Sequence, residues 1–179
     1  KVDTICNELS EYLASDSCQL KKLVFWGKLF RDPSNEETFA DALRKNVSLT
    51  KINLYHDGLE YLEHRPAPIS LHVDGYDEDL NLSTDINLQG LTLNDGSDMY
   101  PSLSTVTKKS IIHYVHNGLT KLHLIYIILN EKYVAELFDA IESAGCLLDL
   151  RLASVRVSDN MQHIIVQYLA TNKMLKRLE

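Results

Sequence analysis

Apolar residues recur along the chain in one spacing: an apolar residue, two others, a second apolar residue, one other and a third. Five complete copies begin at Leu20, Leu49, Leu88, Leu119 and Leu147. A sixth copy begins at Leu175 and is cut off after Leu178. The steps between successive first leucines are nearly equal, except for the longer step from Leu49 to Leu88. Such regular self-similarity is typical of repeat proteins, whose units have a period of roughly 20–50 residues.

Segments with helical spacing of apolar residues precede the triplets. Before the fifth triplet, Val134, Leu137 and Ile141 recur at intervals of three and four residues. Ser34, with Glu37 three residues further on, has the pattern of a capping box at a helix start. Each repeat therefore reads as a strand, a turn and a helix.

One strand and one helix cannot bury their leucines alone, so such repeats are stable only when they stack. Stacking predicts an α/β solenoid, with a parallel β-sheet on the concave face and helices on the convex face. We expect a single domain over residues 1–179, made of about five repeats and a terminal stub. Because the last triplet is incomplete, we expect the chain to be a segment of a longer protein.

The repeats resemble the ribonuclease-inhibitor-like class of leucine-rich repeats, which alternate strand and full helix and also form the sensing end of NOD-like receptors. The resemblance implies a horseshoe segment that serves as the ligand-sensing or scaffolding region of a larger intracellular protein. The chain departs from the family pattern three residues past the last strand leucine, where an asparagine or cysteine is usual. Those positions hold Lys28, Asp57, Gly96, Ile127 and Val155.

The long step places extra residues between the second and third triplets. This stretch contains Pro66, Pro68 and a short alternating run at residues 69–73. We expect an irregular insertion over residues 56–83 that carries its own short strand or hairpin. The acidic run at residues 74–79 favours a solvated loop, and the alternative is a segment that folds over the concave face and masks it.

Side chains at the strand positions between the leucines should point out of the sheet on the concave side. Over the predicted strands these positions hold five Lys or Arg residues against one acid. Trp26 and Tyr55 fall on neighbouring strands, which favours a cross-strand ring pair, with packing of Trp26 under a neighbouring loop as the alternative. The residues that we predict to contact a partner are Lys22, Trp26, Lys51, Asn53, Tyr55, Lys121, His123, Arg151 and Arg177.

The overall charge is acidic, with 25 Asp and Glu residues against 18 Lys and Arg residues. A formal charge of −7 argues against a nucleic-acid binder that relies on bulk positive potential. Three cysteines without C-x-x-C spacing favour a reducing compartment, so we predict a cytoplasmic protein. No apolar run approaches the roughly 20 residues that cross a bilayer, and we expect no membrane insertion.

Few residues could carry chemistry. His113 and His116 are three apart on one presumed helix face, a geometry that can hold a metal, but no acid or cysteine nearby completes a ligand set. The sequence contains no G-x-S-x-G, no Gly-rich phosphate loop and no H-E-x-x-H. We therefore expect no enzyme activity, no metal and no cofactor.

Our hypothesis is a protein–protein interaction module that binds an acidic or amphipathic protein surface through its concave face. One alternative is a regulatory subunit for an enzyme, such as a GTPase activator or a ubiquitin-ligase substrate receptor, in which loops act. A second is an RNA-binding solenoid that uses the same basic and aromatic columns, which the net charge disfavours. A third is an inert linker region of a receptor whose function lies elsewhere.

Overall fold

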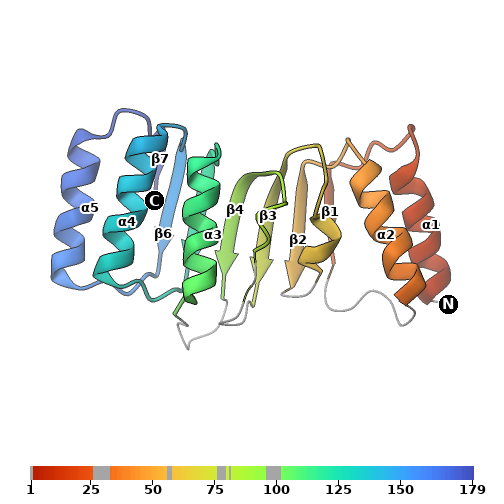
Figure 1. The fold of residues 1–179 in the computed structure, drawn as a ribbon, viewed down its shortest axis with the longest axis horizontal. Coiled ribbons are helices and arrows are strands. Elements are labelled where there is room, and N and C mark those ends of the chain that lie inside the picture. Colours follow the sequence, from red (N-terminus) through yellow and green to blue (C-terminus); the bar gives the residue numbers. More distant parts are fainter. Residues whose placement is uncertain (1, 26–32, 56–57, 76–79, 81, 96–101) are drawn as a thin grey trace.

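The computed structural model describes residues 2–25, 33–55, 58–75, 80, 82–95 and 102–179, in which most successive strands are joined through a helix (Figure 1). The helices are α1 (Val2–Ala14), α2 (Pro33–Lys45), α3 (Thr105–His116), α4 (Glu131–Ala144), α5 (Asp159–Thr171) and the single-turn η1 (Leu59–Leu62). The strands are β1 (Lys22–Val24), β2 (Lys51–Tyr55), β3 (Ile69–Asp74), β4 (Leu88–Asn94), β5 (Lys121–Ile125), β6 (Asp149–Ala153) and β7 (Arg177–Leu178). These strands pair in parallel and in chain order within one sheet.

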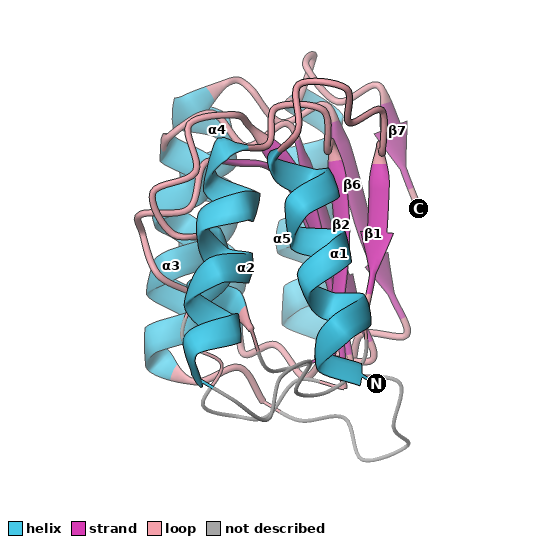
Figure 2. Ribbon diagram, turned by 90° about the vertical axis from the view of Figure 1, so that its right-hand side faces the viewer, coloured by secondary structure: helices cyan, strands magenta, loops and turns pink. Residues whose placement is uncertain are grey.

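The sheet and the helices form two layers. Viewed end-on in Figure 2, the strands lie on one side of the molecule and the helices on the other. Adjacent strands are successive in the chain, so each connection advances the sheet by one strand. The predicted α/β solenoid, with a parallel sheet on one face and helices on the other, is confirmed.

The central residues of the triplets form a continuous buried ladder. The strand register places Leu23, Ile52, Leu71, Leu91, Leu122 and Leu150 side by side on neighbouring strands. None of these side chains is more than 9% exposed. Full burial of one such side chain stabilises the fold by roughly 1.5–3 kcal/mol. A repeat separated from its neighbours would lose most of that stabilisation.

The long step between the second and third triplets is divided by a strand. Ile52 of β2 pairs with Leu71 of β3, and Leu71 pairs with Leu91 of β4, so β3 lies midway along the step. β3 lies within the segment 56–83, for which we expected an irregular insertion with a short strand of its own. The strand is a full member of the main sheet, so the sheet has seven strands where the triplets marked six.

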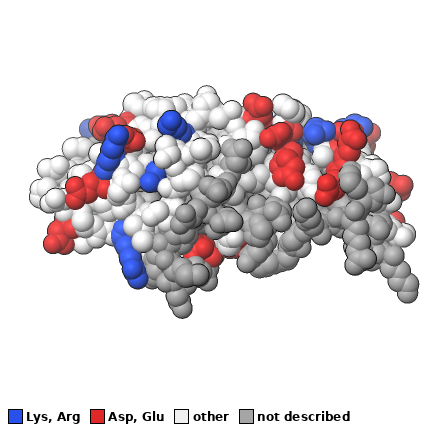
Figure 3. All heavy atoms as spheres, turned by 60° about the horizontal axis from the view of Figure 1, so that its bottom comes forward, with Lys and Arg blue, Asp and Glu red and all other residues white. Residues whose placement is uncertain are grey.

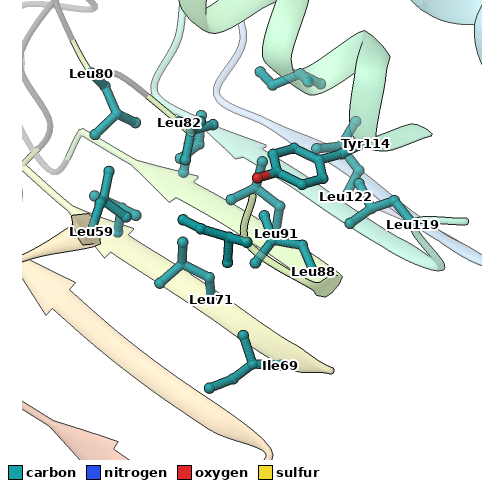
Figure 4. Packing of buried hydrophobic residues seen from close by; sticks show 14 of the residues in the cluster. Leu59, Ile69, Leu71, Leu80, Leu82, Leu88, Leu91, Tyr114, Leu119 and Leu122 are labelled. Carbon is teal, nitrogen blue, oxygen red and sulfur yellow. The ribbon is translucent and has the colours of Figure 1, made fainter. Parts of the chain in front are cut away.

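The two short repeats on either side of β3 fill their core without a long helix among the described residues. Leu59 of η1 is buried, and so are Leu80 and Leu82 of the connection that follows β3. Figure 4 shows these side chains gathered over the strands together with Leu71 and Leu91. Leucines from short connections thus occupy the side of the sheet that helices cover elsewhere.

A buried arginine joins the first short repeat to the helix before it. Arg65 is 2% exposed, and its Nη2 donates to the carbonyls of Asn46 and Leu49, both at 2.8 Å. Its Nε donates to the carbonyl of Leu43 at 3.2 Å, and its Nη1 donates to that of Ala67 at 2.5 Å. Two of these carbonyls lie at the end of α2, where a helix leaves its last acceptors without a partner. Burial lowers the pKa of Arg65.

The turns after β5 and β6 share one geometry. Tyr126 and Ser154, which directly follow these strands, have φ angles of 58° and 52°. The left-handed region is uncommon for residues other than glycine, so its repetition marks a shared turn. The turn is thus regular although Ile127 and Val155 replace the usual asparagine or cysteine. The other three departures from the family pattern lie outside the described residues.

Replacing Arg65 with leucine should destabilise the fold strongly, because several buried carbonyls would lose their donor. Each unsatisfied buried acceptor costs about 1–3 kcal/mol, so we expect the free energy of unfolding to fall by about 3–5 kcal/mol. Arg65→Lys should recover little of this loss, because an ammonium group cannot reproduce the planar fork of donors. Urea denaturation followed by circular dichroism measures the change.

Arg44→Gln is the matched control for this measurement. Arg44 forms a partly exposed ion pair with Asp41, and its loss should cost less than about 1 kcal/mol. An equal, small effect of Arg65→Leu and Arg44→Gln would contradict the structural role of Arg65.

Candidate functional site

The strand positions between the leucines form rows across the concave face. One row passes through Lys22, Lys51, Ser70, Gly90, Lys121, Asp149 and Arg177. The next row passes through Val24, Asn53, His72, Thr92, His123 and Arg151. The structure therefore brings seven of the nine predicted contact residues into two adjacent rows.

The two predicted aromatic contacts are Trp26 and Tyr55. The backbone of Tyr55 ends β2 and pairs with Asp74 of β3 in a third row. The side chain of Tyr55 and the whole of Trp26 lie outside the described residues. Their expected ring pair stays a prediction.

The middle of the concave face is hollowed. A depression of about 290 Å³ opens over β2 to β7, and its lining includes Lys51, Ser70, Gly90, Thr92, Lys121 and Arg151. Gly90 contributes to this hollow because it has no side chain. A Cβ atom built on Gly90 would lie 2.9 Å from Ser70 Oγ and 3.4 Å from Lys121 Cβ.

Asp149 of β6 is held by two bases of β5. Nε2 of His123 lies 2.9 Å from Asp149 Oδ1, and Nζ of Lys121 lies 4.0 Å from Oδ2. Because an ionised carboxylate only accepts hydrogen bonds, His123 donates from Nε2. Burial lowers the pKa of His123, and the hydrogen bond to Asp149 opposes this shift. The imidazole is therefore mainly neutral at pH values near 7.

Two further carboxylates lie on the described part of this face. Asp74 accepts a hydrogen bond of 2.8 Å from Nε2 of His72. Glu179, directly after β7, accepts from Arg177 and lies 3.3 Å from Nε of Arg151. The described residues of the face therefore include five Lys or Arg and three acids, where the sequence pattern had indicated one acid.

Sequence analysis did not place Ser70, His72, Asp74 or Glu179 on this face. The signal for the first three was the alternating run at residues 69–73, because it marks a strand. The signal for Glu179 was its separation from Arg151 along the chain, which equals the regular step between the last two triplets.

Lys22 and Lys51 differ from the other basic residues of the rows. Both are exposed. Among the residues that the structure describes, neither has a carboxylate within ion-pair distance. On the described part of the concave face, Lys22 of β1 and Lys51 of β2 are thus the Lys and Arg residues without an ion-pair partner.

The helix side and lower edge, as Figure 3 presents them, carry both signs of charge interspersed among uncharged residues. His113 and His116 of α3 are exposed. The described part of the chain contains no group of three His, Cys, Asp or Glu side chains that could hold a metal ion. In the same part of the chain, no helix has both the length and the apolar character needed to span a membrane.

Comparison with known proteins gives a likeness in structure. No protein-family model matches the chain, and no curated protein matches its sequence. Among solved structures, the C-terminal domain of tropomodulin from Caenorhabditis elegans is similar over 92% of this chain and 91% of that chain, with a TM-score of 0.46 and 12% identity. Function is therefore argued from the residues of this chain.

His123 should make the stability of the protein depend on pH. Its folded-state pKa lies below the ordinary value, so the unfolded state binds more protons as the solution is acidified. The stability that neutral His123 contributes is fully present above the unfolded-state pKa and is lost as the pH falls through the folded-state pKa. We expect the melting temperature to fall between about pH 7.5 and pH 5.5, and to fall less in His123→Gln. If the melting temperature falls equally in the wild type and in His123→Gln, the pH dependence comes from groups other than His123.

Proposed function

We propose that this chain is a protein-binding module that binds an acidic protein surface with the concave face of its sheet. The observation that carries the proposal is the alignment of five basic residues on one face of a chain whose formal charge is −7. The proposed contacts are Lys22, Lys51, Asn53, Lys121, His123, Arg151 and Arg177, with Trp26 and Tyr55 as apolar contacts.

Two physical features support binding on this face. Solenoids present extended concave surfaces, and complementary charge steers a partner to such a surface. Arg151 and Arg177 are both held by Glu179, which restricts their side chains before binding and lowers the entropy that binding would cost. Lys22 and Lys51 supply exposed charge that a partner can neutralise.

The proposed context is a cytoplasmic protein, larger than this chain, of which the module is the ligand-sensing or scaffolding region. Cys18 and Cys146 are free thiols. Sγ of Cys18 is buried and accepts hydrogen bonds from Asn46 and Ser48, each at 3.3 Å. Structural thiols in this state are consistent with a reducing compartment.

Removal of positive charge from the concave face should abolish capture of a partner. The variant is Lys51→Glu, Lys121→Gln and Arg151→Gln, which places no new acid beside Asp149 or Glu179. We expect at least about tenfold weaker binding, equivalent to about 1.4 kcal/mol. A quantitative pull-down from cell lysate identifies the partner, and titration with the purified partner at low and high salt measures its affinity.

The control variant combines Lys45→Glu, Lys109→Gln and Lys173→Gln, which changes the net charge equally at exposed positions outside the sheet. Both variants must melt like the wild type before their binding is compared. The concave face is excluded as the binding surface if both variants bind as well as the wild type, or if both lose binding equally.

A further inference from the structure

The concave face supplies counter-charges for most of its own bases. Asp74, Asp149 and Glu179 each accept from, or pair with, basic side chains of their own or the neighbouring strand. These contacts lie on β3 and from β5 to the end of the chain. The basic side chains of this surface thus already bind carboxylates of the chain itself, at three separate places.

The hollow lies beside bases that are less fully paired with carboxylates of the chain. Lys51, Ser70, Gly90 and Lys121 follow one another in a single row across four strands. Neighbouring strands are about 4.8 Å apart, so the backbones of the two lysines are separated by roughly 14 Å. Two long, flexible side chains can converge over Gly90 across that distance. Lys51 has no carboxylate partner among the described residues, and Lys121 has only the 4.0 Å contact with Asp149.

We infer that the hollow over Gly90 binds the carboxylate of a partner's Glu or Asp side chain, between the ammonium groups of Lys51 and Lys121. The hydroxyls of Ser70 and Thr92 belong to residues that line the same hollow and are able to donate to a carboxylate. This inference rests on the proposed function and states the chemistry of the group that the module recognises.

The donors around the hollow favour a carboxylate over a phosphate. Recognition of phosphorylated peptides relies on clusters of arginines, whose forked donors match the phosphate oxygens. Arg151 and Arg177 line the hollow, but both are held by Glu179. Glu179 does not occupy every N–H group of these two arginines, so the preference for a carboxylate rests on Lys51 and Lys121, the two bases nearest Gly90 in its row. The phosphoserine peptide described below tests this preference.

The test is an NMR titration of the isotope-labelled chain with the tripeptide N-acetyl-Ala-Glu-Ala-amide. The same peptide with glutamine is the neutral control, and the same peptide with phosphoserine is the third arm. We expect the glutamate peptide to bind at least about fivefold more tightly than the glutamine peptide. Its saturable shifts should centre on the backbone amides of Lys51, Ser70, Gly90, Thr92 and Lys121, and the phosphoserine peptide should bind no more tightly.

Gly90→Ala tests the hollow without changing any charge. The new Cβ would meet the hydroxyl of Ser70, which can rotate away, so the strand should keep its fold. We expect about fivefold weaker binding of the glutamate peptide. The double variant Gly90→Ala with Ser70→Gly removes the crowded side chain and should restore part of the affinity. Lys51→Met, which keeps an unbranched apolar stem without the ammonium group, should weaken binding as much as Gly90→Ala.

Three results would overturn the inference: shifts spread evenly over the surface, undiminished binding by Gly90→Ala, or tighter binding of the phosphoserine peptide. The last result would replace a carboxylate site with a phosphopeptide site. Failure here is distinguishable from failure of the proposed function. If charge removal abolishes capture of the partner and Gly90→Ala does not, the module binds with its concave face but not through this hollow.

Discussion

The structure depends on one constraint, which is that every strand must bury its apolar residues against both the next strand and the connection that covers it. Regular repeats meet this constraint with a strand and a helix. The connections on either side of β3 are too short for a long helix, and leucines such as Leu59 and Leu82 cover the sheet there. Arg65 completes the junction, because its donors satisfy carbonyls of α2 and of the next connection that would otherwise be buried without partners.

The sequence was sufficient to predict the fold wherever the apolar triplet is intact. The strand β3 was predicted as part of an insertion and not as part of a regular repeat, because its residues do not match the triplet of large apolar residues. Since Ile52 pairs with Leu71 and Leu54 with Val73, the position that corresponds to Leu49 is Pro68. A proline at the first position and a valine at the third do not match a search for leucines. Spacing alone therefore assigned the segment to an insertion.

The role of Arg65 had no local signal in the sequence. Its acceptors Leu43, Asn46 and Leu49 all belong to the preceding repeat, far from it along the chain. The rows of the concave face were easier to predict, because strand alternation is enough to find them once the strands are known. The charge of the face was overestimated, since two of its three described acids were not assigned to it: Asp74 lies on a strand that was expected within an insertion and not in the main sheet, and Glu179 is the last residue of the chain.

The short repeats also decide how the sheet bends. Packed helices need about 8–10 Å each, whereas neighbouring strands are only about 4.8 Å apart, so a layer with one helix per strand forces the sheet to curve away from the helices. From β2 to β4, η1 is the sole helical turn among the described residues, and this crowding is relieved. We therefore expect the sheet to curve least from β2 to β4, between two more strongly curved ends. A rigid partner shaped to one uniform arc would touch the ends of this surface and leave the centre open, whereas an extended segment could follow it throughout.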